Sequence, residues 1–239
     1  MSDSKVETEL ARRLEAGEEA VLATVIRTDG EPPSRAGAKI LLDRDRALAG
    51  TLGCSEFDTA AAGDAAGLLE SGAPSLRTYR HDLGSIEVYL EAYPAAPTLL
   101  VAADTPVARA LVRWAPELGF RVRALPEGEP APTDLGRDLY VVHTNHDAPD
   151  LPELLEAVLS RDPPARYVGL MGSRRHTGHH LDALARRGVP AEQLERIQTP
   201  VGIDIGARTP EEIALSMLAG LVAIRRGARL RWLDASHSV

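Results

Sequence analysis

Tyr167-Val-Gly-Leu-Met-Gly-Ser-Arg-Arg175 and Thr199-Pro-Val-Gly-Ile-Asp-Ile-Gly-Ala-Arg-Thr-Pro210 are the stretches that decide the fold of this chain. Each predicts an extended segment that enters a glycine turn and then a helix. In the first stretch, Gly172 and Ser173 precede the helix, whose first N–H groups and positive dipole end attract an anion. This turn is therefore our first candidate for a ligand site.

The helix after the second stretch has a strong start signal. Thr209 predicts its N-cap, Pro210 takes the first helical position, and Glu212 completes a capping box. Gly202 and Gly206 allow tight backbone turns just before it. The sequence therefore offers two glycine-lined turns to a small ligand.

Short apolar strands alternate with helices throughout residues 97–239, which we assign to one domain. The predicted strands are 98–102, 121–125, 139–143 and 167–171, and the predicted helices are 107–118, 151–160, 179–187 and 210–226. The alternation implies a mainly parallel sheet covered on both faces. We expect an α/β protein whose second half is a Rossmann-like three-layer domain, with the turns after Ala102, His143 and Met171 at one rim.

Residues 1–94 have a different pattern, typical of an α+β domain. Helices are predicted at 6–15 and 55–69, and extended segments at 20–28, 38–42, 47–52, 75–79 and 85–93. We expect the first three extended segments to be antiparallel neighbours. The Pro94-Ala-Ala-Pro97 segment is a stiff break, and we place the domain boundary there.

The composition limits the kinds of protein that this chain can be. Its 239 residues, 44% of them hydrophobic, are enough for a buried core. A net charge of −8 argues against duplex nucleic acid or an anionic membrane as the main partner. Cys54 is the single cysteine, which excludes an intramolecular disulfide, and we find neither a signal peptide nor a long apolar run. We therefore expect a cytoplasmic protein.

The turn after the first strand of the second domain bears on dinucleotide binding. A dinucleotide site reads Gly-x-Gly-x-x-Gly, so that the backbone can approach the pyrophosphate. Here the chain reads Ala102-Ala-Asp-Thr-Pro-Val107, and Asp104 would place a negative charge beside a negative ligand. Asp104 followed by Pro106 is better explained as an ordinary helix cap. We expect no NAD(P) site, and a Rossmann-type NAD(P)-dependent oxidoreductase is kept as an alternative function.

Polar residues of the two glycine turns are candidate ligand contacts. Ser173, Arg174 and Arg175 form the stronger anion candidate, because guanidinium groups match phosphate oxygens and the serine can cap the helix. Their other interpretation is a capped helix with two solvated arginines. In the second turn, Asp204 could accept hydrogen bonds from a heterocycle or pair with an arginine, and Arg208 lies in the same loop.

Histidines follow two of the predicted strands without forming a metal motif. They occur as His143-x-x-His146-Asp147 and as His176, His179 and His180. The spacing matches no closed zinc set, and no cysteine pairs accompany it. We expect surface histidines and turn caps here, and no structural metal.

Cys54 lies after the turn Gly50-Thr-Leu-Gly53, which could expose its thiol. Ser55 can start a helix whose dipole would favour the thiolate. The other interpretation is an inert, buried cysteine.

Taken together, these segments resemble the XdhC/CoxI family of molybdoenzyme accessory proteins. The N-terminal likeness lies in Ala23–Pro33, Gly37–Lys39 and Gly50–Gly53, and the C-terminal likeness in Asn145–Asp147, Tyr167–Arg175 and Pro200–Ser216. The likeness covers nearly the whole chain. Ser34 departs from the family's usual arginine, Gly53-Cys-Ser-Glu-Phe-Asp58 departs from its three glycines and acid, and the first Rossmann turn lacks glycine.

The resemblance implies a homodimeric chaperone that binds molybdenum cofactor, as molybdopterin or its cytosine dinucleotide form. Such a protein protects the cofactor during sulfuration and helps to insert it into xanthine dehydrogenase or a CO dehydrogenase-like molybdenum hydroxylase. The apo-hydroxylase and a cysteine desulfurase are the implied partners. A ligand-free protein-interaction module that recruits these partners is the second alternative function.

Molybdenum cofactor calls for donors to its phosphate, a hydrogen-bonding slot for its pterin and a soft ligand for its metal. The chain supplies these three kinds of group, in that order, with Gly172 to Arg175, with Asp204 and Arg208, and with Cys54. We expect Lys39 or Arg35 to assist at the phosphate and Gly53 to shape the turn before the thiol. Cys54 is a candidate molybdenum contact or transient sulfur acceptor.

Overall fold

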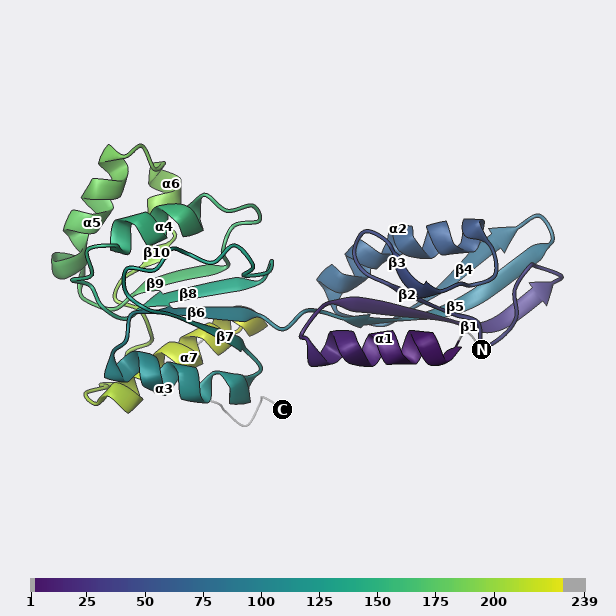
Figure 1. Cartoon of the computed structure of the whole chain (residues 1–239), viewed down its shortest axis with the longest axis horizontal. Helices are drawn as coiled ribbons and strands as arrows, with labels where there is room; N and C mark the ends of the chain where they lie inside the picture. Colours follow the sequence, from purple (N-terminus) through teal and green to yellow (C-terminus); the bar gives the residue numbers. More distant parts are fainter. Residues whose placement is uncertain (1–2, 230–239) are drawn as a thin grey trace. The chain divides into compact units, whose positions relative to one another are not determined.

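The computed structural model describes residues 3–229 of the chain. They fall into two compact units that meet in sequence between Ala96 and Pro97, each with its own sheet (Figure 1). One sheet is antiparallel and the other is parallel, which confirms the predicted α/β class. No helix of the described residues is long and apolar enough to cross a membrane.

The first unit is an antiparallel sheet in the order β3-β2-β1-β5-β4. Its strands are β1 (Ala20–Gly30), β2 (Lys39–Leu42), β3 (Ala47–Gly50), β4 (Ser75–His81) and β5 (Gly84–Tyr93), and its helices are α1 (Asp3–Glu15) and α2 (Ser55–Ser71). The first three strands are antiparallel neighbours, as predicted. The third strand ends at Gly50, where φ is 82°, and not at Leu52 as predicted.

The two helices of this unit lie on opposite faces of the sheet (Figure 1). On α2, Phe57, Ala61, Ala65 and Leu68 recur at helical spacing and are buried against β1, β2 and β5. Val6 of α1 is buried on the other face. The longer helix therefore covers the main core of the first unit.

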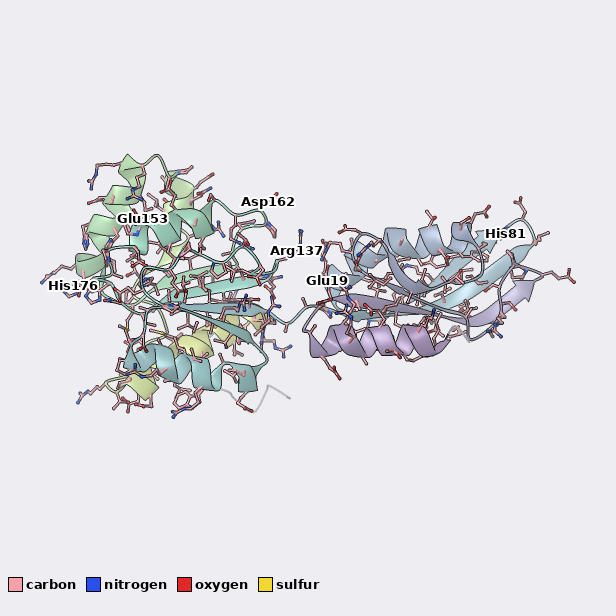
Figure 2. All side chains as sticks on the ribbon, viewed as in Figure 1. Glu19, His81, Arg137, Glu153, Asp162 and His176 are labelled. Atoms are coloured by element: carbon pink, nitrogen blue, oxygen red, sulfur yellow. The ribbon has the colours of Figure 1, made fainter. Side chains whose placement is uncertain are left out.

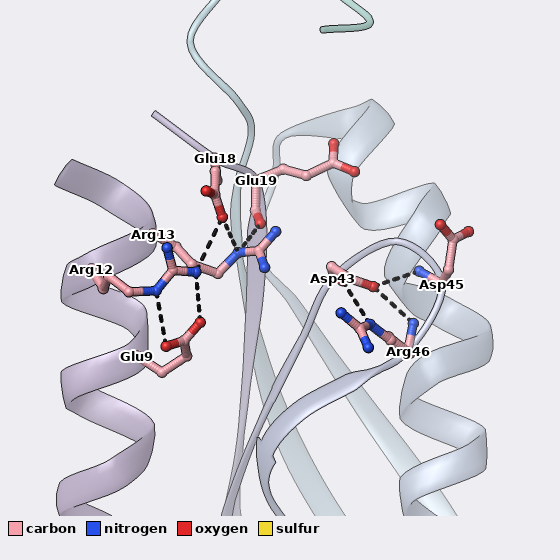
Figure 3. Close-up of polar contacts among 8 residues, drawn as sticks. All are labelled: Glu9, Arg12, Arg13, Glu18, Glu19, Asp43, Asp45 and Arg46. Atoms are coloured by element: carbon pink, nitrogen blue, oxygen red, sulfur yellow. Dashed lines mark hydrogen bonds and ion pairs between the residues drawn. The ribbon is translucent and has the colours of Figure 1, made fainter. Parts of the chain in front are cut away.

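Polar contacts tie the end of α1 to the start of β1 (Figure 3). Arg12 Nη2 lies 2.8 Å from Glu9 Oε1 and 3.3 Å from Glu18 Oε2. Arg13 Nε donates to the Glu19 carbonyl at 2.9 Å. Ion pairs this exposed are screened by solvent, so they orient the connection more than they stabilise the unit.

The second unit is a parallel sheet in the order β10-β9-β8-β6-β7. Its strands are β6 (Thr98–Ala102), β7 (Arg121–Leu125), β8 (Leu139–His143), β9 (Tyr167–Leu170) and β10 (Ile197–Gln198). Its helices are α3 (Pro106–Trp114), η1 (Pro116–Leu118), α4 (Leu151–Leu159), α5 (Arg174–Arg186), α6 (Ala191–Leu194) and α7 (Pro210–Arg226).

Helices cover both faces of this parallel sheet, which confirms the Rossmann-like three-layer domain (Figure 1). Residues of α4 and α5 share one core with β8 and β9. Residues of α3 and α7 share the other with β6 and β8. Because β6 and β8 are buried on both faces, their sequences are continuously apolar rather than alternating.

Three helix and strand predictions need correction. The helix predicted over residues 107–118 ends at Trp114, because Pro116 cannot continue it, and a 3₁₀ turn completes the segment. The helix predicted from His179 begins five residues earlier, at Arg174. The short β10 and α6 were not predicted, since a two-residue strand and a four-residue helix carry no periodic signal.

The start of α7 is confirmed in full. The Thr209 hydroxyl accepts a hydrogen bond from Glu212 N, and the Glu212 carboxylate accepts one from Thr209 N. Pro210 occupies the first turn. The helix therefore begins where local sequence alone places it.

We expect Gly53→Ala to destabilise the first unit by about 2–4 kcal/mol, since φ is positive there. A Cβ at Gly53, where φ is 126°, would lie 2.0 Å from the Pro33 carbonyl oxygen. Urea unfolding followed by far-UV circular dichroism measures the loss. The control is Gly63→Ala on α2, where a Cβ meets nothing within 4 Å. That change should stabilise the helix by about 0.5–1 kcal/mol, and equal effects of the two variants would contradict the argument.

Candidate functional site

The carboxyl ends of the parallel strands form one rim of the second unit. Ala102 of β6 pairs in register with His143 of β8, which pairs with Leu170 of β9. Arg137 and Asp162, which precede β8 and β9, lie at the opposite end of this sheet from His176, which follows β9 (Figure 2). The turns predicted to share one rim therefore do so.

The strand order reverses next to β6: β7 lies on one side of β6, and the later strands β8, β9 and β10 lie on the other. Open α/β sheets bind ligands at such a switch point, here between β6 and β8. Here Thr144 N and Thr144 Oγ1 both donate to the Ala102 carbonyl, at 3.1 and 3.0 Å. Thr105 Oγ1 donates to Thr144 Oγ1 at 2.9 Å and accepts from Ala108 N at 3.1 Å. The Ala102 carbonyl, the two threonine hydroxyls and Ala108 N are therefore bonded to one another at the switch point.

This turn also corrects the predicted helix cap. Thr105, not Asp104, is the N-cap of α3, with Pro106 in the first turn. Asp104 instead pairs with Arg109, with 2.7 Å between Oδ1 and Nη1. Ala103 adopts φ of 73°, which a glycine would adopt without strain. The cap differs because the Thr105 hydroxyl also reaches Thr144, a contact outside the local sequence.

The glycine turn after β9 lies directly under a histidine ring. Gly172 has φ of 125°, and a Cβ there would lie 3.1 Å from Cγ of His146. The His146 ring stacks on His176 with 5.2 Å between ring centroids, and His180 Nε2 lies 2.7 Å from the His146 carbonyl oxygen. Nδ1 of His146 is buried with no partner among the described residues. Glycine is therefore needed for close packing as well as for the turn.

Two buried threonines join the two glycine turns. Thr199 Oγ1, in the segment before the second turn, donates to the Gly172 carbonyl at 2.9 Å and lies 3.0 Å from Thr177 Oγ1. Val201 N donates to the Leu170 carbonyl at 2.9 Å. Thr177 and Thr199 are 0% and 4% exposed, so this link is shielded from water. Neither threonine was predicted as a site residue, because their pairing spans 22 residues and leaves no local signal.

The start of α5 differs in one respect from the prediction. Ser173 is its N-cap, but its side chain makes no capping hydrogen bond. Its hydroxyl lies 3.3 Å from Nδ1 of His176 instead. No side chain therefore caps the start of α5, although His176 N donates to the Ser173 carbonyl at 2.9 Å. Arg175 is exposed beside them, whereas the side chain of Arg174 lies outside the described part of the chain.

The polar residues of the second glycine turn are exposed and engaged locally. Asp204 Oδ1 accepts from Gly206 N at 3.1 Å. Arg208 N donates to Glu212 Oε2 at 2.8 Å. Within residues 3–229, Asp204 and Arg208 do not pair with each other. Both charged ends remain accessible at the rim.

No group of three or more metal-ligating side chains occurs within the described residues. The histidines are divided between buried and exposed positions. His143 and His180 are 2% and 7% exposed, while His146, His176 and His179 are partly or fully accessible. The prediction that histidines after these strands would lie at the surface is therefore wrong for His143 and His180.

The candidates of the first unit form a separate group. Lys39 and Gly53 line a pocket of about 290 Å³ together with Arg35. Lys39 Nζ also lies 2.7 Å from Glu7 Oε1. Cys54 is the N-cap of α2, half-buried against the core, and makes no side-chain capping bond. Cys54 does not line this pocket.

His143 is a buried neutral histidine at the end of β8. Burial lowers the pKa of its imidazole to about 4, and Nδ1 accepts a hydrogen bond from Asn145 N at 3.2 Å. The nearby Asp150 acts in the opposite direction, and His180 acts in the same direction as burial. The ring is therefore a structural acceptor rather than a proton carrier near neutral pH.

The fold and the rim together define a protein class: a small α+β unit followed by a Rossmann-like unit whose first turn has no glycine. The family description "XdhC Rossmann domain" matches residues 99–221, and "XdhC and CoxI family" matches residues 13–80. The chain therefore belongs to the XdhC/CoxI family, as its sequence resemblance predicted.

Two similar proteins give the scale of the likeness. The protein YqeB of Escherichia coli K12, described as uncharacterized, is 27% identical over 92% of this chain. The match covers 46% of that protein, so the chain spans about half the length of this relative. A solved structure described as a xanthine dehydrogenase from Bacillus halodurans is 19% identical, covers 96% of this chain and 97% of that chain, and has a TM-score of 0.46.

We expect acid to destabilise the fold through His143. The unfolded imidazole has a pKa near 6.5, so the unfolded chain binds this proton more readily than the folded chain does. The free energy of unfolding is therefore not reduced by His143 above about pH 6.5. Below that pH it falls as the pH approaches 4, by about 1–2 kcal/mol at pH 5. His143→Asn keeps an acceptor for Asn145 N and does not titrate. Urea unfolding at about pH 7.5 and about pH 5 should show a smaller pH effect in the variant; equal effects would contradict the assignment.

Proposed function

We propose that this protein binds molybdenum cofactor and carries or protects it for sulfuration and insertion into a molybdenum hydroxylase of the xanthine dehydrogenase or CO dehydrogenase type. The observation that carries the proposal is that both units match the XdhC/CoxI family, in the same chain and order. In this proposal the protein is an accessory protein, and the apo-hydroxylase is its client.

The phosphate of the cofactor is assigned to the turn between β9 and α5. The start of α5 has no side-chain cap, so its first N–H groups can donate to phosphate oxygens. Arg175 is exposed at the same turn. The buried Nδ1 of His146, unpartnered within residues 3–229, adds a polar group that lies against Gly172 of this turn. These groups fit an anion, and in this proposal Arg174 contributes a second guanidinium.

The pterin is assigned to the second glycine turn. Asp204 can accept from its N–H groups while Arg208 donates, since both are exposed and their charged ends are not paired with each other. The link through Thr199 holds this turn next to Gly172. A ligand at one turn is therefore within reach of the other.

When bound, the cofactor supplies the molybdenum and its dithiolene sulfurs, while this chain supplies binding and shielding groups. The proposal extends to Cys54 as a contact for the soft metal, because a thiolate is the ligand type that such a metal prefers. It also includes a homodimer and a cysteine desulfurase as a second partner. Cys54→Ser with full ability to activate the client would remove the thiol from the proposal.

The switch point argues against nicotinamide chemistry. Thr105 already accepts from Ala108 N, a donor that a pyrophosphate would use at the start of α3, and the carboxylate of Asp104 lies beside it, paired with Arg109. A ligand-free protein-interaction module remains the competing function, because it needs neither turn.

The deciding experiment is an anaerobic titration of the purified protein with molybdenum cofactor, with NADPH in a parallel cell. Retention on a desalting column and the absorbance of the pterin report uptake. Stoichiometric uptake of the cofactor alone supports the proposal. Uptake of neither ligand supports the interaction module, and uptake of NADPH alone supports the oxidoreductase.

We expect the double change Arg174→Ala and Arg175→Ala to weaken cofactor binding at least tenfold, which is about 1.4 kcal/mol, through lost charge-assisted hydrogen bonds. The matched control is Arg186→Ala, an exposed arginine in the last turn of the same helix. It lies about 17 Å further along the helix axis than the two changed arginines. Unchanged affinity in a folded double variant, or an equal loss in the control, would exclude this phosphate site.

A further inference from the structure

The first unit contains a pocket whose charged lining residues are all basic. Its volume is about 290 Å³, and it is lined by Pro33, Ser34, Arg35, Ala38, Lys39, Thr51 and Gly53. No acidic residue is among them, although the chain as a whole carries a net charge of −8. The local charge therefore opposes that of the whole protein, which is the pattern of an anion site.

The walls of this pocket are held in place without a ligand. On one side, Thr51 N donates to the Lys39 carbonyl at 2.8 Å, which fixes the glycine turn against β2. On the other side, the Ser34 hydroxyl donates to the Leu52 carbonyl. Gly53 allows this approach, because any Cβ would collide with the Pro33 carbonyl. A preformed pocket loses little conformational entropy when a ligand binds to it.

Arg35 is the cation most available in the pocket. Its guanidinium has no hydrogen-bond or ion-pair partner within residues 3–229, and the residue is exposed. The Arg35 backbone is nevertheless held, because its carbonyl accepts from Ala38 N at 3.1 Å. The charge is thus unneutralised and mounted on a fixed loop.

Lys39 already holds a carboxylate at the pocket. Its ammonium lies 2.7 Å from Glu7 Oε1 of α1, and their side chains are 29% and 49% exposed. An ion pair this exposed is screened by solvent and contributes little to stability. A phosphate oxygen can therefore replace Glu7 at Lys39 at little cost.

The nearby acidic residue Asp58 is engaged elsewhere. Its two carboxylate oxygens accept from Thr51 Oγ1 at 2.8 Å and from Leu52 N at 2.7 Å. Asp58 therefore holds Thr51, which lines the pocket, and is not itself a lining residue.

We propose that this pocket is an oxyanion site, which binds a phosphate group through Arg35 and through Lys39 in competition with Glu7. The guanidinium supplies a planar pair of donors and the ammonium supplies a point charge, a combination that suits tetrahedral oxyanions. Glu7 acts as a built-in competitor that occupies the lysine when no anion is bound. The site belongs to the first unit alone and does not depend on the cofactor assigned to the second.

The test is a titration of the full chain with inorganic phosphate, with chloride at equal ionic strength as the reference. Amide ¹H–¹⁵N shifts of Ala38, Thr51 and Gly53 report this pocket, and those of Ser173 and His176 report the other unit. Arg35→Ala should weaken phosphate binding at the pocket amides about fivefold or more, since it removes the principal charge-assisted donors. Glu7→Gln should strengthen it about twofold or more, because the competing carboxylate is removed.

The matched control is Arg27→Ala. Arg27 is an exposed arginine of the same unit, whose Nε lies 3.3 Å from Glu87 Oε2 outside the pocket. The Arg27→Ala change removes the same charge and should leave the affinity of the pocket for phosphate unchanged. Pocket amides that do not respond to millimolar phosphate would overturn the proposal, as would equal losses in the Arg35 and Arg27 variants. Neither result would bear on cofactor uptake, which the Arg174 and Arg175 variants test separately.

Discussion

The buried hydroxyl of Thr199 is the contact on which the rim of the second unit depends. It donates to the Gly172 carbonyl and meets the hydroxyl of Thr177, so that it joins the two glycine turns and the first turn of α5. Replacing it with an apolar group would remove the side-chain donor to the buried Gly172 carbonyl, at a cost of about 1–3 kcal/mol, while the Thr177 hydroxyl would keep its bond to the Ser173 carbonyl. The spacing of the two turns is therefore set by bonds between the two segments, those of Thr199 and that of Val201 N to the Leu170 carbonyl, rather than by either loop alone.

That link has consequences for each neighbouring group. Because Gly172 is fixed, the His146 ring can lie against it and stack on His176. Because Ser173 faces His176 rather than the helix start, the first N–H groups of α5 have no side-chain cap. At α3, by contrast, Thr105 satisfies the helix start and also reaches Thr144. Two helix starts on one rim thus differ: a threonine side chain caps α3, whereas α5 has no side-chain cap.

The first unit also gathers positively charged groups in one place, but it does so without a row of helix starts. Its sheet is antiparallel, so no row of helix starts gathers at one edge, and the basic pocket is built from a loop and a turn that Gly50 and Gly53 allow to approach. Lys39 is balanced by Glu7, whereas Arg35 has no such partner within residues 3–229. Both units therefore present cationic or N–H donors on a chain whose net charge is negative. Local arrangement, not overall charge, decides where an anion can bind.

The sequence by itself determined the features that depend on a few neighbouring residues. The capping box of Thr209 and Glu212, the α/β alternation and the place of each glycine turn all follow from backbone preferences within one or two turns of chain. Only the tertiary structure decided that Thr105 rather than Asp104 caps α3, that His143 is buried, and that Thr177 meets Thr199. It also decided that Arg35 and Lys39 share a pocket with Gly53. These contacts join residues far apart in sequence, and their free energy depends on how strands and helices pack, which no local pattern encodes.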